Sequence, residues 1–189
     1  MFMKIPSSKS CQNGIRESGA GFTLVEIIIA ISILAVGVIL VYGAFSHVVM
    51  VTHDFSARFT AAYLTQEGLE IIRNLRDNNF IAIANNPLNP LLSWSMGLTG
   101  SPCDTGCMAD YKTVTTAQLA SYSGAFLALN TDGFYSYDAG ATATKFKRKI
   151  TITPVTGNTD VLHINVLVTW DYNGKAFSFE ASEYLYNWY

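Results

Sequence analysis

The stretch that decides the fold reads GFTLVEIIIAISILAVGVILVYGAFSHVVM and runs from Gly21 to Met50. No Asp, Glu, Lys or Arg occurs between Glu26 and Asp54. As a helix that rises about 1.5 Å per residue, this uncharged segment would be roughly 40 Å long. The apolar core of a bilayer is about 30 Å thick, so the segment is long enough to cross it. The sequence therefore predicts a membrane-spanning helix over residues 22–52.

A short basic segment precedes the predicted span. Residues 1–21 carry Lys4, Lys9 and Arg16 against Glu17, and basic residues stay on the cytoplasmic side of a membrane. The apolar region of a secretory signal peptide is only about 7–15 residues long, which makes this uncharged segment too long to be one. We therefore expect a single-pass protein of the cytoplasmic (inner) membrane, with its N-terminus inside and its C-terminal domain outside.

The run GFTLVEIIIAISILAVGV, from Gly21 onward, resembles the processing site and N-terminal helix of type IV prepilins and pseudopilins. The resemblance implies that a prepilin peptidase removes residues 1–21 by cutting between Gly21 and Phe22, and that Phe22 is N-methylated. It implies that Glu26 is the assembly residue, because a carboxylate buried in a helical bundle needs a cation, which the N-terminal amine of a neighbouring subunit can supply. Gly43 stands where many major pilins have a helix-bending proline, which fits a locally weak helix but not a fixed kink. The run ISILAVGV is more similar to minor pilins and pseudopilins than to major pilins.

The resemblance also implies which molecules the protein interacts with, what its function is and where it is located. The partners are the prepilin peptidase, other pilin or pseudopilin subunits, the inner-membrane assembly platform and, before assembly, membrane lipid. The expected function is that of a structural subunit of a type IV pilus or of a type II secretion-like filament, at the cell surface or in the periplasm. Two alternatives stay open: a minor pilin that binds DNA or a surface, and a single-span membrane-anchored ectodomain that does not polymerise.

The composition of the chain also indicates which other functions are not expected. The 189 residues are 50% hydrophobic and 14% charged, with a formal net charge of −2. A chain without excess positive charge is not a general phosphate binder, so a nucleic-acid partner is not indicated by charge alone. No spacing typical of a catalytic triad, a phosphate loop or a metalloprotease helix occurs. We expect no enzyme activity, no cofactor and no metal site.

Helical periodicity continues beyond the span. Over residues 53–78 the apolar positions recur every three to four or seven residues, as in an amphipathic helix, and are Phe55, Phe59, Ala62, Leu69 and Ile72. The pair Asn78-Asn79 is a plausible stop signal. Such a helix needs a partner layer only along this second half.

The C-terminal residues 144–189 supply that layer. Apolar and polar residues alternate from Leu162 to Trp170, and Asn173-Gly174 is a hairpin signal before a return strand at residues 176–182. Residues 145–153 also alternate. The fold class is therefore α+β and pilin-like, with a long N-terminal helix, membrane-spanning in its first half, packed on a C-terminal antiparallel β-sheet. The pilin resemblance implies that residues 79–143 form a variable connecting region, with short pieces of order expected at 116–122 and 134–137.

Two of the three cysteines lie close together in the connecting region, as Cys103-Asp104-Thr105-Gly106-Cys107. Outside the membrane thiols oxidise, so a local disulfide is expected. A redox site would have two intervening residues rather than three, and a zinc site needs more ligands. Cys11 lies in the segment that processing would remove.

Three lysines, Lys145, Lys147 and Lys149, alternate along the strand over residues 145–153 and share a face, with Arg148 on the other face. They are candidate contacts for DNA or another anion. The alternative is a solvated face or a sheet edge that lysines protect from aggregation. Because residues 22–189 carry nine basic against thirteen acidic side chains, the second interpretation is favoured.

Overall fold

A computed structural model describes residues 21–188, apart from the side chains of residues 46, 47, 49–51 and 53. The predicted leader, Cys11 included, lies outside the described residues except for Gly21. The chain divides into two compact units between Met50 and Val51. One helix, α1 (Leu24–Asn85), contributes to both.

The first unit contains the predicted span. Within the described residues one segment, Leu24–Phe45, is long and apolar enough to cross a membrane; its mean hydropathy is 3.0 and none of it is buried. The helix begins after Thr23, whose side-chain oxygen accepts a hydrogen bond from the Glu26 backbone N–H at 3.2 Å. This is the usual way to satisfy a donor that the first turn of a helix leaves without a partner.

The second half of α1 ends later than the sequence predicts. The expected stop at Asn78-Asn79 is wrong, because the helix continues to Asn85. The side chain of Asn79 is buried, and its amide donates to the carbonyls of Trp94 and Met96, both at 3.0 Å. Asn79 therefore holds the returning chain against the helix and does not cap it. The helix stops two residues before Pro87, which restricts the residue before it to extended backbone.

The C-terminal layer is an antiparallel sheet in the order β2-β1-β6-β7-β8. Its three long strands are β6 (Phe146–Val155), β7 (Asn158–Tyr172) and β8 (Lys175–Tyr186). The turn between β7 and β8 has positive φ at Asn173 (51°) and Gly174 (73°), as the Asn-Gly signal predicts. Two strands that the sequence did not predict, β1 (Cys107–Met108) and β2 (Ala120–Ser121), extend the sheet beyond β6.

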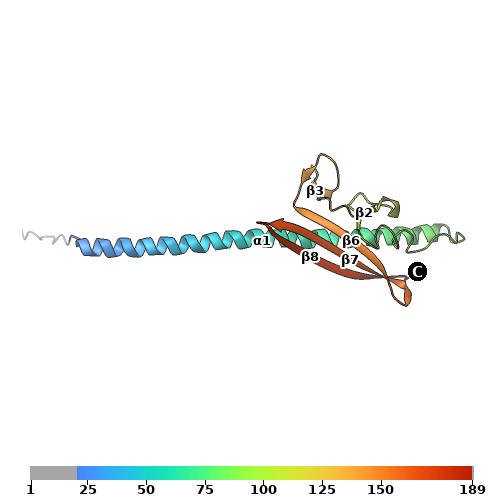
Figure 1. Cartoon of the computed structure of the whole chain (residues 1–189), viewed down its shortest axis with the longest axis horizontal. Coiled ribbons are helices and arrows are strands. Elements are labelled where there is room, and N and C mark those ends of the chain that lie inside the picture. Colours follow the sequence, from blue (N-terminus) through green and yellow to red (C-terminus); the bar gives the residue numbers. More distant parts are fainter. Residues whose placement is uncertain (1–20, 189) are drawn as a thin grey trace, which may run out of the picture. The chain divides into compact units, whose positions relative to one another are not determined.

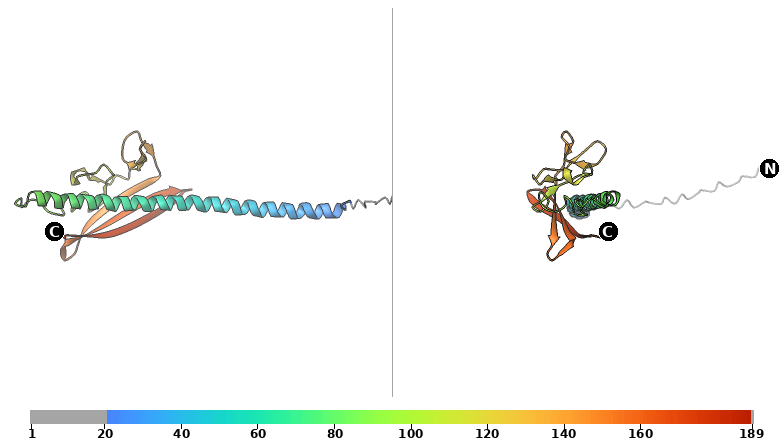
Figure 2. Two further views of the ribbon diagram at one scale, coloured as in Figure 1. Left: turned by 180° about the vertical axis from the view of Figure 1, so that it is seen from behind. Right: turned by 90° about the vertical axis from the view of Figure 1, so that its right-hand side faces the viewer.

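The connecting region contains short ordered pieces. A second, three-stranded sheet is formed by β3 (Ala128–Leu129), β4 (Tyr135–Ser136) and β5 (Thr142–Ala143). A single 3₁₀ turn, η1, covers Thr116–Gln118. The strand expected near residues 134–137 and the helical turn expected near 116–122 are thus both present in shorter form. Within the second unit, β6, β7 and β8 lie along α1 (Figure 1), and the view along the helix shows the sheet to one side of it (Figure 2).

The face of α1 that packs on the sheet agrees only in part with the face that the periodicity indicates, since Ile72 is buried and Leu69 packs against the core as expected. Phe55 and Phe59, expected in the core, are 56% and 74% exposed. The buried stripe consists mainly of small and aliphatic residues, namely Ala57, Ala61, Leu64, Gly68, Ile72 and Leu75. At Gly68 a Cβ atom would lie 2.9 Å from Val166 Cγ1, so only glycine lets the helix approach the sheet this closely. Aromatic side chains in this stripe would hold the two layers apart.

Candidate functional site

The predicted processing site lies directly before α1. Gly21, Phe22 and Thr23 are outside the helix and exposed, Phe22 to 78%. A Cβ atom at Gly21 would meet nothing within 4 Å. Gly21 and Phe22 therefore lie in exposed, non-helical chain directly before α1.

Glu26 occupies the first turn of α1, where a negative charge is favoured by the partial positive charge of the helix N-terminus. Thr23 and Glu26 have the spacing of a capping box, of which the Glu26 N–H to Thr23 Oγ1 bond is present. The carboxylate is exposed. It stands at the start of a stretch of α1 that carries no further Asp, Glu, Lys or Arg before Asp54, and it is exposed to a cation from another molecule.

A buried arginine ties the second unit's layers together. Arg148 is fully buried, and its guanidinium donates to the carbonyls of Leu64 at 3.0 Å and Ala109 at 2.5 Å. It also forms an ion pair with Glu67, at 3.2 Å between Nη1 and Oε2. The guanidinium thus joins β6 to α1 and to the segment before β2. The sequence placed Arg148 on the face opposite the lysines, and the burial pattern of β6 agrees, but it gave no signal for these contacts.

The side chain of Tyr137 lies next to Arg148 and has a shifted pKa. The Tyr137 hydroxyl donates to the Arg148 carbonyl at 3.3 Å. Burial raises the pKa of Tyr137 and outweighs the opposite effect of the nearby Arg148 charge. The Tyr137 side chain therefore stays neutral and available as a donor throughout the neutral pH range.

Cys103 and Cys107 form a disulfide, and both residues are buried. The Cys103 carbonyl accepts the Ile152 N–H at 2.9 Å, and Cys107 pairs with Ile150. The disulfide therefore closes a short loop within the connecting region, and backbone hydrogen bonds attach this loop to β6.

The predicted lysines share the outer face of β6 but differ in their surroundings. The ammonium of Lys147 lies 4.5 Å from the ring centre of Phe126, and that of Lys149 lies 5.8 Å from the ring centre of Tyr122. A side chain at Gly106 would collide with Lys149. The connecting region thus covers part of this face, and all three lysines are half-buried. Their role as anion contacts stays a prediction.

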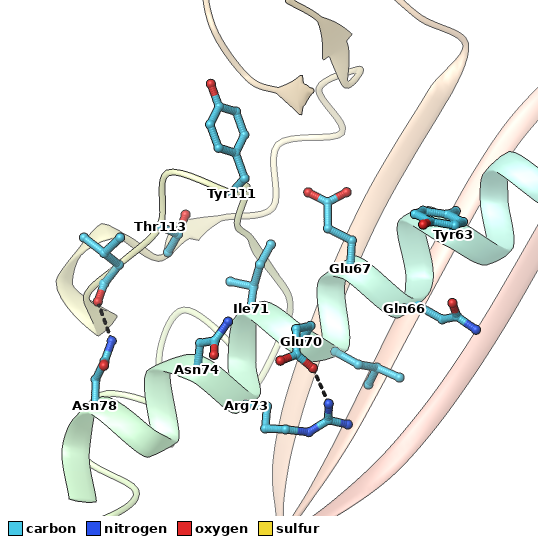
Figure 3. Close-up of a pocket in the computed structure, with 12 residues that line it drawn as sticks. Tyr63, Gln66, Glu67, Glu70, Ile71, Arg73, Asn74, Asn78, Tyr111 and Thr113 are labelled. Atoms are coloured by element: carbon cyan, nitrogen blue, oxygen red, sulfur yellow. Dashed lines mark hydrogen bonds and ion pairs between the residues drawn. The ribbon is translucent and has the colours of Figure 1, made fainter. Parts of the chain in front are cut away.

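A groove of about 800 Å³ runs along α1 beside residues 111–114 (Figure 3). Its acidic side chains are already neutralised, since Glu67 pairs with Arg148 and Glu70 with Arg73. Desolvation lowers the pKa of Arg73, but hydrogen bonds and charges from Glu183 and Glu70 outweigh it and raise the pKa. One wall is closed by Asn78, whose amide donates to the Val114 carbonyl at 3.2 Å. No group of three or more His, Cys, Asp or Glu side chains suited to a metal occurs within residues 21–188.

Comparison with known families identifies one segment of the chain. Residues 18–42 match the prokaryotic N-terminal methylation motif, the signature of type IV prepilins and pseudopilins. This confirms the resemblance expected from residues 21–38. The signature is one of structural, pilin-like proteins rather than of enzymes. No curated protein and no solved structure matches the chain.

Proposed function

We propose, for a chain that carries the prepilin and pseudopilin signature at residues 18–42, the function of a minor subunit of a type IV pilus or a type II secretion-like filament. The precursor is cut between Gly21 and Phe22 by a prepilin peptidase, which also methylates Phe22. The mature chain is held in the inner membrane by the first half of α1, with the C-terminal domain outside. It then joins the filament through Glu26.

The observation that carries this proposal is the arrangement around residue 21. An exposed, non-helical Gly21–Phe22 bond is followed, four residues after Phe22, by the acid that precedes the uncharged first part of α1. A carboxylate at that point is costly inside an apolar bundle unless a cation lies next to it. Cleavage creates such a cation, the amine of residue 22, in every copy. Processing and assembly are therefore chemically linked.

The exposed surface of α1 supports assembly. Every described residue of the span is exposed, so it requires lipid before assembly and neighbouring helices after it. Phe55, Phe59 and Tyr63 continue an apolar stripe into the second unit at four-residue spacing, and Tyr63 is 77% exposed. A protein that never polymerised would leave this stripe in water.

Processing is tested by the intact mass and N-terminal sequence of the chain, expressed with and without a prepilin peptidase. We expect an N-terminus at methylated Phe22 only when the peptidase is present. Gly21→Val should block the cut, whereas Gly37→Val, which also meets open space, should not. An intact Met1 in the presence of the peptidase would refute the proposal.

Assembly is tested separately with Glu26→Gln, which keeps the size of the side chain and removes its charge. The variant should be cut and methylated normally but be lost from sheared filaments. Ser32→Ala is the control, because the Ser32 hydroxyl donates only within its own helix, to the Ile28 carbonyl at 2.8 Å. Normal incorporation of Glu26→Gln would refute the assembly role of Glu26, whereas absence of the unmodified chain from sheared filaments would favour the anchored, non-polymerising alternative.

A further inference from the structure

Some basic side chains of the second unit form ion pairs with carboxylates, and others have no such pair in the described chain. Within the described chain every arginine, together with Lys112, forms an ion pair with a carboxylate. The lysines of residues 21–188 for which no such pair is present are Lys145, Lys147, Lys149 and Lys175. Lys147 and Lys149 lie on the outer face of β6, Lys145 directly precedes this strand, and Lys175 begins β8 (Figure 1). Three of the four lysines without an ion pair are thus close together on or directly before β6.

A hollow of about 290 Å³ lies among these strands and contains two of the four lysines, Lys145 and Lys147. The strand register places one polar side chain from each of β6, β7 and β8 next to one another in this hollow. Lys147 pairs with Thr169 on β7, and Thr169 pairs with Ser178 on β8. All three line the hollow, as does Asp171. Two lysines, a threonine and a serine therefore line the same hollow, together with one aspartate.

Aromatic rings hold the two ammonium groups in place. Lys147 Nζ lies 4.5 Å from the centre of the Phe126 ring, and Lys145 Nζ lies 5.4 Å from Tyr172 and 5.6 Å from Phe146. Such contacts stabilise a cation without using its N–H donors. These ring contacts thus leave the N–H donors of both ammonium groups available, and both side chains line the hollow.

We propose that this hollow binds the phosphoryl group of a phosphate-bearing ligand. A phosphoryl group offers acceptor oxygens in several directions, which matches donors that come from three strands. The two lysines and Asp171 leave one net positive charge, which suits a singly charged phosphoryl group. Lys149 lies outside the hollow and is not part of the site. The site depends only on residues of the second unit, and it stands whether or not the chain assembles into filaments.

The test uses the full chain in dodecyl maltoside micelles, a detergent without phosphate, titrated with inorganic phosphate at constant ionic strength. We expect saturable shifts of the Thr169 and Ser178 amide signals in ¹H–¹⁵N spectra. The double variant Lys145→Gln/Lys147→Gln should weaken binding about tenfold or more. Asp171→Asn should tighten it several-fold, because a like charge is removed from the wall.

Lys149→Gln is the matched control, since it removes an equal charge from the same strand. It should leave the phosphate affinity within about twofold. Equal weakening by Lys149→Gln would mean diffuse attraction rather than a site, and would overturn the proposal. Absence of saturable shifts, or weaker binding by Asp171→Asn, would do the same.

Two further titrations identify the source of the phosphoryl group. Binding of a short oligonucleotide that strengthens with length and falls steeply with salt would assign the site to a nucleic-acid backbone. Binding of glycerol 3-phosphate, with no gain from the oligonucleotide, would assign it to a lipid headgroup or free phosphate. Failure of all three ligands would leave no phosphoryl site.

Discussion

Replacing Arg148 by Met should destabilise the second unit substantially, because the Arg148 side chain is fully buried. The substitution keeps the length and apolar body of the side chain but leaves the Leu64 and Ala109 carbonyls without their guanidinium donors. A buried group that loses its partner costs about 1–3 kcal/mol. Glu67 also loses its cation, although its side chain is 28% exposed and keeps part of its hydration. We expect the free energy of unfolding to fall by about 3–5 kcal/mol, the range found when one partner of a buried ion pair is removed.

The assay is guanidinium unfolding of the full chain in micelles, followed by tryptophan fluorescence. Trp94 and Trp170 are 7% and 2% exposed, so both report on the second unit. Lys147→Met is the control, because it makes the same type of change on the outer face and should cost less than about 1 kcal/mol. If Arg148→Met costs less than about 1 kcal/mol, or no more than Lys147→Met, then the guanidinium does not hold the layers together.

Three further predictions concern other parts of the second unit. Replacing both Cys103 and Cys107 by Ala should lower the free energy of unfolding by about 2 kcal/mol, the chain-entropy value for so short a loop; an unchanged unfolding midpoint would contradict this. Hydrogen bonds from Lys112 and then Ser136 lower the pKa of Asp138 from its usual 3.8, so their contribution to stability is present above that pH and lost as the pH falls through the lower, folded-state pKa. Asp138→Asn should therefore flatten the acid limb of a stability-against-pH curve, and an unaltered limb would count against the interaction. Phe59→Ser should change the free energy of unfolding by less than about 0.5 kcal/mol while reducing filament yield, and a large loss of stability would mean that Phe59 is a core residue after all.

Local patterns predict a large part of this protein. The span follows from one uncharged run, and the processing motif is contiguous, so neither needs knowledge of distant residues. The β7 alternation and the Asn173-Gly174 turn are also local, because side-chain direction in a strand and positive φ in a tight turn depend on neighbouring residues. These features appear where the sequence places them.

Other features depend on which distant residues meet, and here local patterns fail. Phe55 and Phe59 have helical spacing like a buried stripe, but close approach of α1 to the sheet selects Ala57, Ala61 and Gly68 instead. Asn79 has the local pattern of a helix stop, but its side-chain amide donates to the carbonyl of Trp94, fifteen residues further along the chain. In each case a tertiary contact outweighs a weak local preference.

The charged residues on and directly before β6 show most clearly which features follow from the sequence alone and which depend on the tertiary structure. Alternation alone puts Arg148 on one face and its neighbouring lysines on the other, since the period of a strand is two. Alternation does not say that Arg148 finds two carbonyls and Glu67 in the core, or that Lys145 and Lys147 border a hollow while Lys149 does not. The alternation of side-chain direction follows from the extended backbone of a single strand, so it can be predicted from the sequence without knowledge of distant residues. The partners of each charge exist only after α1, the connecting region and the sheet have come together.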